Sequence, residues 1–428
     1  MMQQKSIRIR FGSGNFLTLF SIVYRMGLDF LYVNYISTIF QYTGFNYTFS
    51  WGRYVLSWIF FFAIVPFIHK YTKSDRFSDI IILFLMFFSF IPFTTMVAFY
   101  DGISYAFIFS NVIYWAFLLF FMNVFPNIKL PRLKTTFIND LAMLVIALIM
   151  GIVIFIVSYK YAGLHFTVSL ANVYDMRDAA REFSMPLLLR YLFTASKAIN
   201  PLLLLYGLSR KRHLYSSYIV FIQILSFSIN GSKTVFFSTL LSVVLFYVYK
   251  KKYLTQIALL FSGITILSCI ETGVFKTIYL LGYGIRRVFF LPNQLNWYYF
   301  DFFTRYEPDY FRQGFLKWFG AKSPYMDIDH LIGAAYFGHS DMGANNGLIS
   351  DAFTNLGWIG VLVMPLALVV FLKIINACAK GIDPKIYVVT AMTVSFIFVS
   401  SFMMTALFTH GIFAICFVLY LLPRTVEK

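Results

Sequence analysis

Charged residues are scarce in this chain of 428 residues, and their scarcity excludes most soluble folds. They make up 12% of the sequence, whereas hydrophobic residues make up 60% and the mean hydropathy is +0.74. So few charges cannot cover the surface of a globular domain with polar side chains. We therefore expect an all-α polytopic membrane protein, with residues 1–428 forming a single integral membrane domain without internal repeats.

Cysteines are also few. Cys269, Cys378 and Cys416 are too scattered for a disulfide framework or a cysteine metal site. The first apolar run lacks a small-residue cleavage site, so we expect the first helix to be retained. The fragment Gly231-Ser-Lys-Thr234 is not a phosphate-binding P-loop, because the earlier glycine and the preceding strand of that motif are missing.

Apolar runs are abundant. About 20 such residues are needed to cross roughly 30 Å of hydrocarbon. The sequence offers about twelve candidates, which are residues 16–40, 54–71, 78–99, 104–125, 138–159, 187–208, 214–230, 234–250, 254–275, 347–372, 386–407 and 409–423.

Basic residues indicate which loops face the cytoplasm, since Lys and Arg are retained on that side. With Met1 inside, every inside segment carries at least two of them, while the short outside loops around Asp101 and His410 carry none. Both termini are then cytoplasmic, and two long loops, residues 160–186 and 276–345, face outside. The net charge of +17 belongs largely to the inside segments and does not indicate a nucleic-acid partner.

Some charged residues lie within the expected helices. Arg190 and Lys197 would lie roughly 6 Å and 16 Å below the outer surface, and their spacing of two turns places both on one face. Charges at this depth are candidates for function, so we favour a shared polar cavity over a structural ion pair. For Arg25 and Asp29, one turn apart, we favour the structural ion pair.

The outside segments contain further candidates. Lys233 begins a helix, where free N–H groups favour an anion, although a lone interfacial lysine is an equally ordinary explanation. In residues 160–186, charges that include Arg177 and Arg181 alternate at helical spacing, which also fits a self-paired surface helix. The aromatic run 294–303 is expected at the membrane interface, with carbohydrate stacking as the alternative.

The end of the long loop is rich in polar residues. Asp327, Asp329, His330 and His339 are conceivable metal ligands, but their spacing matches no familiar site, so we predict no metal. His339, in a Gly-rich turn, is better placed as a general base or hydrogen-bond donor. In the next helix, Asp351 and Asn355 share a face, and Gly357 and Gly360 predict close helix packing.

Three parts of this pattern resemble the O-antigen polymerase family, which is related to the O-antigen ligases. They are the Ser232-Lys233 turn, the stretch from Arg286 to Asn296, and the run from Gly338 to Gly360. The resemblance implies a GT-C-like fold with a large periplasmic loop bearing short helices. It also implies glycosyl transfer between undecaprenyl-diphosphate-linked glycans at the periplasmic face of the bacterial inner membrane.

The resemblance also implies roles for residues. The implied catalytic residues are His339, Arg286 and Arg287. Asp341 and Asp351 are alternatives to His339 as the base, and arginine suits the diphosphate leaving group. Residues expected to bind the diphosphate are Lys233, Arg190, Lys197, Arg177 and Arg181. Those expected to contact the acceptor glycan are Asp341, Asn346, Asp351 and Arg305. No cofactor or metal is expected.

The expected partners are the lipid-linked donor and acceptor, membrane lipid and a membrane protein that regulates chain length. In one respect the sequence departs from the family, because neither long loop has an Arg followed eleven positions later by Gly. Metal-dependent membrane glycosyltransferases resemble one another in having acidic residues in the first outside loop, and residues 41–53 contain none. A ligase acting on lipid A core and a lipid-linked oligosaccharide flippase are the alternatives.

Overall fold

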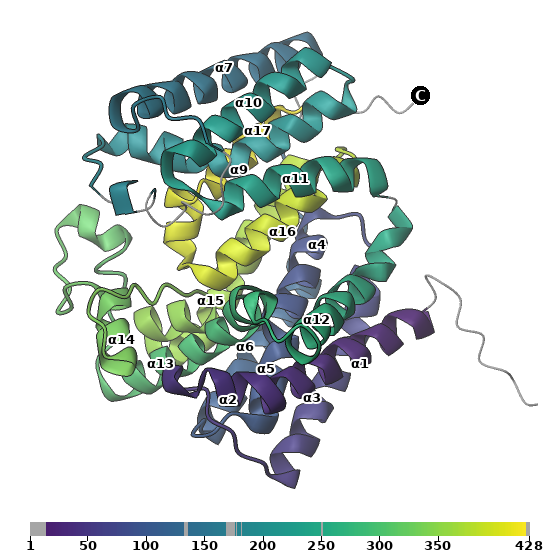
Figure 1. The fold of residues 1–428 in the computed structure, drawn as a ribbon, viewed down its shortest axis with the longest axis vertical. Helices are drawn as coiled ribbons and strands as arrows, with labels where there is room; N and C mark the ends of the chain where they lie inside the picture. The colour runs from purple at the N-terminus through teal and green to yellow at the C-terminus, as the bar shows by residue number, and fades with distance from the viewer. Residues whose placement is uncertain are drawn as a thin grey trace, which may run out of the picture.

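The regular structure of the protein is helical in a computed structural model that describes residues 14–131, 136–167, 176, 178–180, 182–249 and 251–424 (Figure 1). Over these residues no strand forms, and a single bridge pairs Tyr47 with Tyr100. The α-helices are α1 Gly14–Leu31, α2 Ser37–Ile39, α3 Trp51–Tyr71, α4 Phe77–Leu85, α5 Ile91–Phe99, α6 Tyr105–Val124, α7 Thr136–Tyr161, α9 Leu187–Ser209, α10 His213–Asn230, α11 Lys233–Val248, α12 Ile257–Gly273, α13 Leu291–Arg305, α14 Ile328–Phe337, α15 Ile349–Ala379, α16 Pro384–Ser400 and α17 Ile412–Leu421.

Wider or tighter turns join several of these helices. The π-helical segments are η1 Tyr32–Ile36, η3 Met86–Phe90, η5 Leu280–Phe290 and η7 Thr405–Thr409. The 3-10 segments are η2 Gln41–Thr43, η4 Lys251–Gln256 and η6 Phe315–Phe319. As predicted, the long loop 276–345 bears short helices, namely η5, α13, η6 and α14.

A helix lies in each of the twelve predicted segments, and the apolar character of several identifies a polytopic membrane protein. Among the described residues, seven helical stretches are long and apolar enough to cross a bilayer: Gly14–Ile39, Trp51–Tyr71, Phe77–Phe99, Tyr105–Val124, Phe137–Tyr161, Leu254–Gly273 and Ile349–Ala379. The total of twelve spans and the GT-C arrangement remain predictions.

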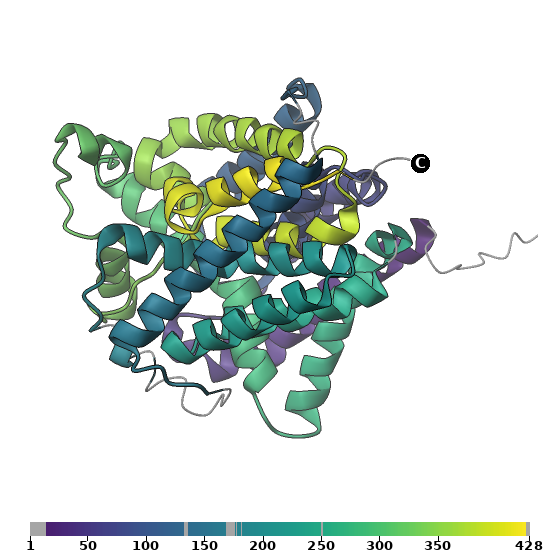
Figure 2. The same ribbon diagram turned by 90° about the horizontal axis from the view of Figure 1, so that it is seen from above.

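The stretch Phe77–Phe99, formed by α4, η3 and α5, lies in the centre of the molecule and is buried throughout. A helix whose side chains are apolar on every face is expected to be covered by protein on every face, as this one is. Helices α1, α3 and α6 lie on one side of it, and α7, α9 and α10 lie on the other (Figure 1). Between them, α15 and α16 pack on α4, and Figure 2 shows α15, in light green, along one edge of the assembly.

Contacts divide the loops into two groups, one at each end of the bundle. At one end, the Thr48 N–H donates to Phe99 O (2.9 Å), Gln294 Nε2 donates to Thr43 O (2.9 Å), and the Gly347 N–H donates to Val399 O (3.0 Å). At the other end, Lys373 Nζ donates to Met122 O (3.0 Å) and Arg424 Nη2 donates to Cys378 O (2.8 Å). The first group contains loops predicted outside and the second contains loops predicted inside. Which end faces the cytoplasm stays a prediction.

The aromatic run 294–303, expected at the membrane interface, is mostly covered by protein, because most residues of α13 are buried. The Phe300 ring packs edge-on against Phe353 of α15, with centroids 4.7 Å apart, and the Tyr299 ring packs against Phe402 at 5.8 Å. Packing against protein therefore accounts for these rings, whereas the depth of the run in the membrane stays a prediction. The crowded rings pack against α15 and the segment after α16.

The predicted ion pair between Arg25 and Asp29 is confirmed. Arg25 is fully buried, and its Nε donates to Thr94 Oγ1 (2.7 Å). Its Nη2 donates to Ser57 Oγ (3.0 Å) and to the Thr94 carbonyl (2.9 Å). Helices α1, α3 and α5 are thus joined through one side chain.

Helix α15 bends sharply at Gly357, whose φ of 54° and ψ of −134° are not helical. A side chain there would be strained, since this region favours glycine. The Cβ of any residue replacing Gly360 would lie 2.1 Å from Ala352 O, so this glycine permits the close approach across the bend. Gly357 and Gly360 thus shape α15 itself, rather than the predicted packing between helices. Residues 349–356 form a separate short piece at the end of the bundle.

Candidate functional site

A cavity of about 280 Å³ opens beside this short piece, at the bundle end that carries the long loop. Four carboxylates line it, and its described lining contains no lysine or arginine. The lining residues are Tyr299, Asp309, Phe311, Gln313, Gly314, Asp327, Ile328, Asp329, Asn345, Asn346, Asp351, Asn355, Phe402, Met404 and Thr405.

Asp351 is almost fully enclosed, with 3% of its surface exposed. Its Oδ1 accepts a hydrogen bond from Asn355 Nδ2 (2.7 Å), one helical turn away. Its Oδ2 accepts one from the Met403 N–H (2.7 Å), in the segment that follows α16. The carboxylate is therefore held in one orientation on the cavity wall.

The segment from Asp309 to Phe311 closes another side. The Asp309 N–H donates to Thr354 O (2.6 Å), and the Phe311 N–H donates to Asn355 Oδ1 (2.9 Å). Tyr310 and Phe311 have φ angles of 52° and 61°, in the left-handed region that side chains seldom adopt. Such strain persists only where surrounding contacts enforce it, and it is common at functional sites.

Asn346, which is 1% exposed, also lines the cavity. Its Nδ2 donates to Pro292 O (2.8 Å), Asn296 Oδ1 (3.0 Å) and Ser350 Oγ (2.8 Å). These acceptors fix the orientation of the amide. Its buried Oδ1 has no hydrogen-bond partner among the described residues, although an amide oxygen can accept two hydrogen bonds.

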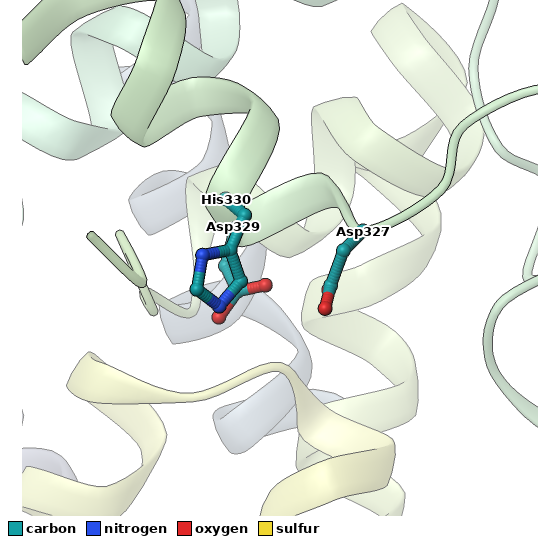
Figure 3. A group of neighbouring side chains, drawn as sticks. All are labelled: Asp327, Asp329 and His330. Carbon is teal, nitrogen blue, oxygen red and sulfur yellow. The ribbon is translucent and has the colours of Figure 1, made fainter. Parts of the chain in front are cut away.

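Asp327, Asp329 and His330 form a cluster at the start of α14, with one ligand atom of each within 4.8 Å of the others. The Asp329 carboxylate lies beside the His330 ring and Asp327 faces the same space (Figure 3). His330 Nδ1 lies 2.8 Å from Ser340 O, and this hydrogen bond raises the pKa of His330. The neighbouring Asp329 carboxyl group, through a hydrogen bond, and burial raise the pKa of Asp327.

The lining indicates what the cavity can bind. Carboxylate and amide oxygens accept hydrogen bonds from hydroxyl groups, and Tyr299, Phe311 and Phe402 add aromatic surface. Four carboxylates without a basic neighbour in the described lining repel a bare anion. The cavity is thus suited to a neutral ligand rich in hydroxyl groups.

Two of the residues predicted to contact the acceptor, Asn346 and Asp351, line this cavity. His339 and Asp341 do not belong to its described lining and are exposed. His339 follows Gly338, which ends α14 with a φ of 72°, so the Gly-rich turn serves to terminate a helix. The roles predicted for His339 and Asp341 remain untested.

Arg286 and Arg287 lie on η5, directly before α13, and neither forms an ion pair among the described residues. The Arg286 guanidinium lies 4.6 Å from the centroid of the Phe40 ring, and its buried Nε has no hydrogen-bond partner in the part of the chain that the structure describes. Burial lowers the pKa of Arg286. From Arg286 to Tyr299, at the cavity, the helical path measures roughly 20 Å, so one small ligand cannot touch both.

The remaining predicted residues are not brought to the cavity. Arg305 forms an ion pair with Asp301 and donates to Tyr336 OH (3.2 Å). Arg190 is exposed on α9, and Lys197 Nζ lies 5.0 Å from the centroid of the Phe193 ring.

Three more predicted residues have no described side chain. Lys233 is the first residue of α11, and its side chain is not described. Arg177 and Arg181 lie outside the described residues. The predicted cluster of diphosphate-binding cations therefore stays a prediction.

Sequence reasoning missed Asp309 and gave too little weight to Asp327 and Asp329. The nearest signal was the group Asp327-Ile-Asp-His330, which was considered only as a set of metal ligands. Asp309 follows Pro308 in a stretch without helical periodicity, and nothing near it in the sequence indicates Asp351 as its neighbour.

Comparisons with known proteins gave no match among family models, curated proteins or solved structures. The case for function therefore depends on the geometry of the cavity and on the motifs in the sequence.

Proposed function

We propose that this protein is a membrane glycosyltransferase that polymerises undecaprenyl-diphosphate-linked oligosaccharide repeat units. It would act at the periplasmic face of the bacterial inner membrane, with both termini cytoplasmic, and would build O-antigen or a related surface polysaccharide. The observation that carries the proposal is the cavity beside α15, where carboxylates, amides and aromatic rings meet at one end of an apolar helical bundle. Such a lining suits a sugar, and a membrane bundle suits a lipid-linked substrate.

In the proposed reaction, an acceptor hydroxyl oxygen attacks the anomeric carbon of the donor glycan. The bond between that carbon and the diphosphate oxygen breaks, and the lipid diphosphate leaves with the bonding electrons. The hydroxyl proton passes to a carboxylate of the protein, for which Asp351 is best placed, because it lies on the cavity wall in a fixed orientation. His339 was the first expectation for this role, but it is not part of the described lining.

Arg286 and Arg287 would bind a diphosphate of the substrates. Neither forms an ion pair among the described residues, and arginine offers paired donors that match phosphate oxygens. Both substrates carry a diphosphate. The separation from the cavity suits the acceptor, whose diphosphate would bind at η5 while its distal sugar reaches the cavity along α13.

The experiment is reconstitution of the purified protein in vesicles with lipid-linked repeat units, followed by gel separation of the products. We expect a ladder of chain lengths, and we expect Asp351→Asn to remove it, because the amide cannot accept the hydroxyl proton. Asp101→Asn is the matched control. Asp101 is exposed in another loop at the same end of the bundle, and its carboxylate accepts a hydrogen bond from the Gly102 N–H (2.9 Å).

Thermal unfolding of both variants would establish that they fold. A wild-type ladder from folded Asp351→Asn would overturn the role of Asp351. Glycan transferred to lipid A core would show a ligase, and unmodified substrate moved across the vesicle membrane would show a flippase. Either product would overturn the polymerase.

A further inference from the structure

We propose that Asp327, Asp329 and His330 bind one divalent cation, of the Mn²⁺ type, at the acidic cavity. This departs from the sequence-based expectation that no metal takes part. The binding proposal depends on the cluster and the cavity and is independent of the reaction proposed above.

The spacing of the cluster suits a bound ion. One ligand atom from each residue lies within 4.8 Å of the others. Ligand bonds of about 2.0 to 2.6 Å place two atoms on opposite sides of a cation about 4 to 5 Å apart. Small side-chain rotations would therefore complete the site without movement of α14.

The hydrogen bonding of His330 is that of a metal ligand. Its Nδ1 lies 2.8 Å from Ser340 O, and a carbonyl only accepts hydrogen bonds, so the proton of the neutral ring belongs on Nδ1. The lone pair is then on Nε2. Metal-binding histidines commonly donate their second ring nitrogen to a carbonyl or carboxylate, which fixes the tautomer and the ring orientation.

Acidic residues at the start of a helix have an ordinary explanation, because they interact favourably with the helix dipole and cap free N–H groups. Asp327 occupies the N-cap position of α14, yet its side chain makes no capping hydrogen bond. Instead it approaches Asp329, a group of the same charge. Capping therefore does not account for the position of its carboxylate.

A second observation at the cavity also indicates a ligand. Asn346 lines the same cavity as Asp327 and Asp329, and its buried Oδ1 is an acceptor without a partner among the described residues. The Asn346 amide cannot flip to exchange Nδ2 and Oδ1, because Nδ2 already donates to three acceptors. A hydrated cation brings water molecules, which can donate hydrogen bonds to such an oxygen.

The donor set favours Mn²⁺. Hard cations prefer the two carboxylate oxygens, and transition metals prefer the imidazole nitrogen. Mn²⁺ accepts both kinds of ligand. Mg²⁺ favours oxygen alone, and structural Zn²⁺ favours four nitrogen or sulfur ligands. Three protein ligands leave positions for water or for a substrate oxygen. If the proposed glycosyl transfer is correct, the cation would let this acidic cavity accept the donor diphosphate.

The test is a titration of Mn²⁺ into the purified, EDTA-treated full chain, with free Mn²⁺ measured by electron paramagnetic resonance. We expect one site per chain in the wild type. We expect Asp329→Asn and His330→Gln each to weaken binding by more than about tenfold, since even the loss of a group behind a ligand costs about 10- to 100-fold. Asp101→Asn is the control, because it removes one exposed carboxylate from the same end of the protein and should leave the affinity unchanged.

Thermal unfolding provides the second measurement. Without Mn²⁺, the variants should unfold close to the wild-type temperature, and Mn²⁺ should raise that temperature in the wild type and the control only. No binding by the wild type, or equal binding by both cluster variants, would overturn the site. Binding of Mg²⁺ or Zn²⁺ in preference to Mn²⁺ would overturn the choice of ion. Mn²⁺ binding without a polymer ladder would uphold the metal site and reject the proposed function.

Discussion

Two arginines, in the first helix and in η5, occupy similar apolar surroundings with different results. The Arg25 guanidinium lies 5.2 Å from the Trp58 ring centroid, and that of Arg286 lies 4.6 Å from the Phe40 centroid. Arg25 has an ion pair and three hydrogen bonds. Arg286 has a buried Nε without a partner and no ion pair among the described residues. The fold alone accounts for the first arrangement, whereas in the second we propose that a diphosphate binds the arginine.

The carboxylates show the same contrast. Asp29 faces Arg25, so its charge is neutralised within the bundle. Asp309, Asp327, Asp329 and Asp351 line a cavity whose described wall contains no lysine or arginine. Charges that are neutralised by the fold hold helices together. The carboxylates of the cavity are the basis for the ligand sites proposed above.

The largest effect should come from Arg25→Met. Removing one partner of a buried ion pair leaves the other uncompensated, which costs about 3 to 5 kcal/mol of stability. The free energy of unfolding in detergent, from denaturant titration, measures this loss. The double variant Arg25→Met with Asp29→Leu should regain much of it, since neither charge then remains. Unchanged stability in the single variant would contradict a structural role.

Arg286→Gln should affect ligand binding rather than stability. Hydrogen bonds to charged groups contribute about 1.5 to 3 kcal/mol, so we expect affinity for a polyprenyl diphosphate to fall by roughly 10- to 100-fold. Fluorescence titration with a labelled lipid diphosphate measures the change. Leu280→Ala, on the same π-helical segment, is the control for disruption of η5. If Arg286→Gln lost as much stability as Arg25→Met and kept its affinity for the lipid diphosphate, Arg286 would be a structural residue like Arg25.

The smallest effect should come from Arg305→Ala. Arg305 has partners in Asp301 and Tyr336, like Arg25, but it is exposed, like the arginines of most surface ion pairs. Exposed pairs contribute about 0 to 1 kcal/mol because water and salt screen them. The same denaturant titration tests this expectation. A loss as large as that of Arg25→Met would show that burial is not what distinguishes the two pairs.

Features with a short sequence separation were predictable. The Arg25 and Asp29 pair is one turn apart on one helix, so periodicity alone brought the two charges together. Apolar runs and basic flanks likewise located the helices and grouped the loops at the two ends. The shared face of Asp351 and Asn355 follows from the same spacing, and their hydrogen bond joins adjacent turns.

The cavity was not predictable by this means, because its walls come from residues 309–314, 327–329, 345–355 and 402–405. Sequence periodicity identifies an apolar helix face but does not tell whether lipid or protein covers it, and so α13 was assigned to the interface. His339 attracted attention through its neighbouring glycines. One of them, Gly338, simply ends α14 in a left-handed conformation.

The bend at Gly357 separates the long part of α15, residues 358–379, from the short piece that lines the cavity. Residues 358–379 measure about 33 Å along a helix, close to the thickness of a hydrocarbon core. A membrane of different thickness would change the tilt of this segment. Residues 349–356 are held separately by hydrogen bonds to Asp309, Phe311 and Met403. We therefore expect the cavity wall to keep its geometry when the tilt of residues 358–379 changes.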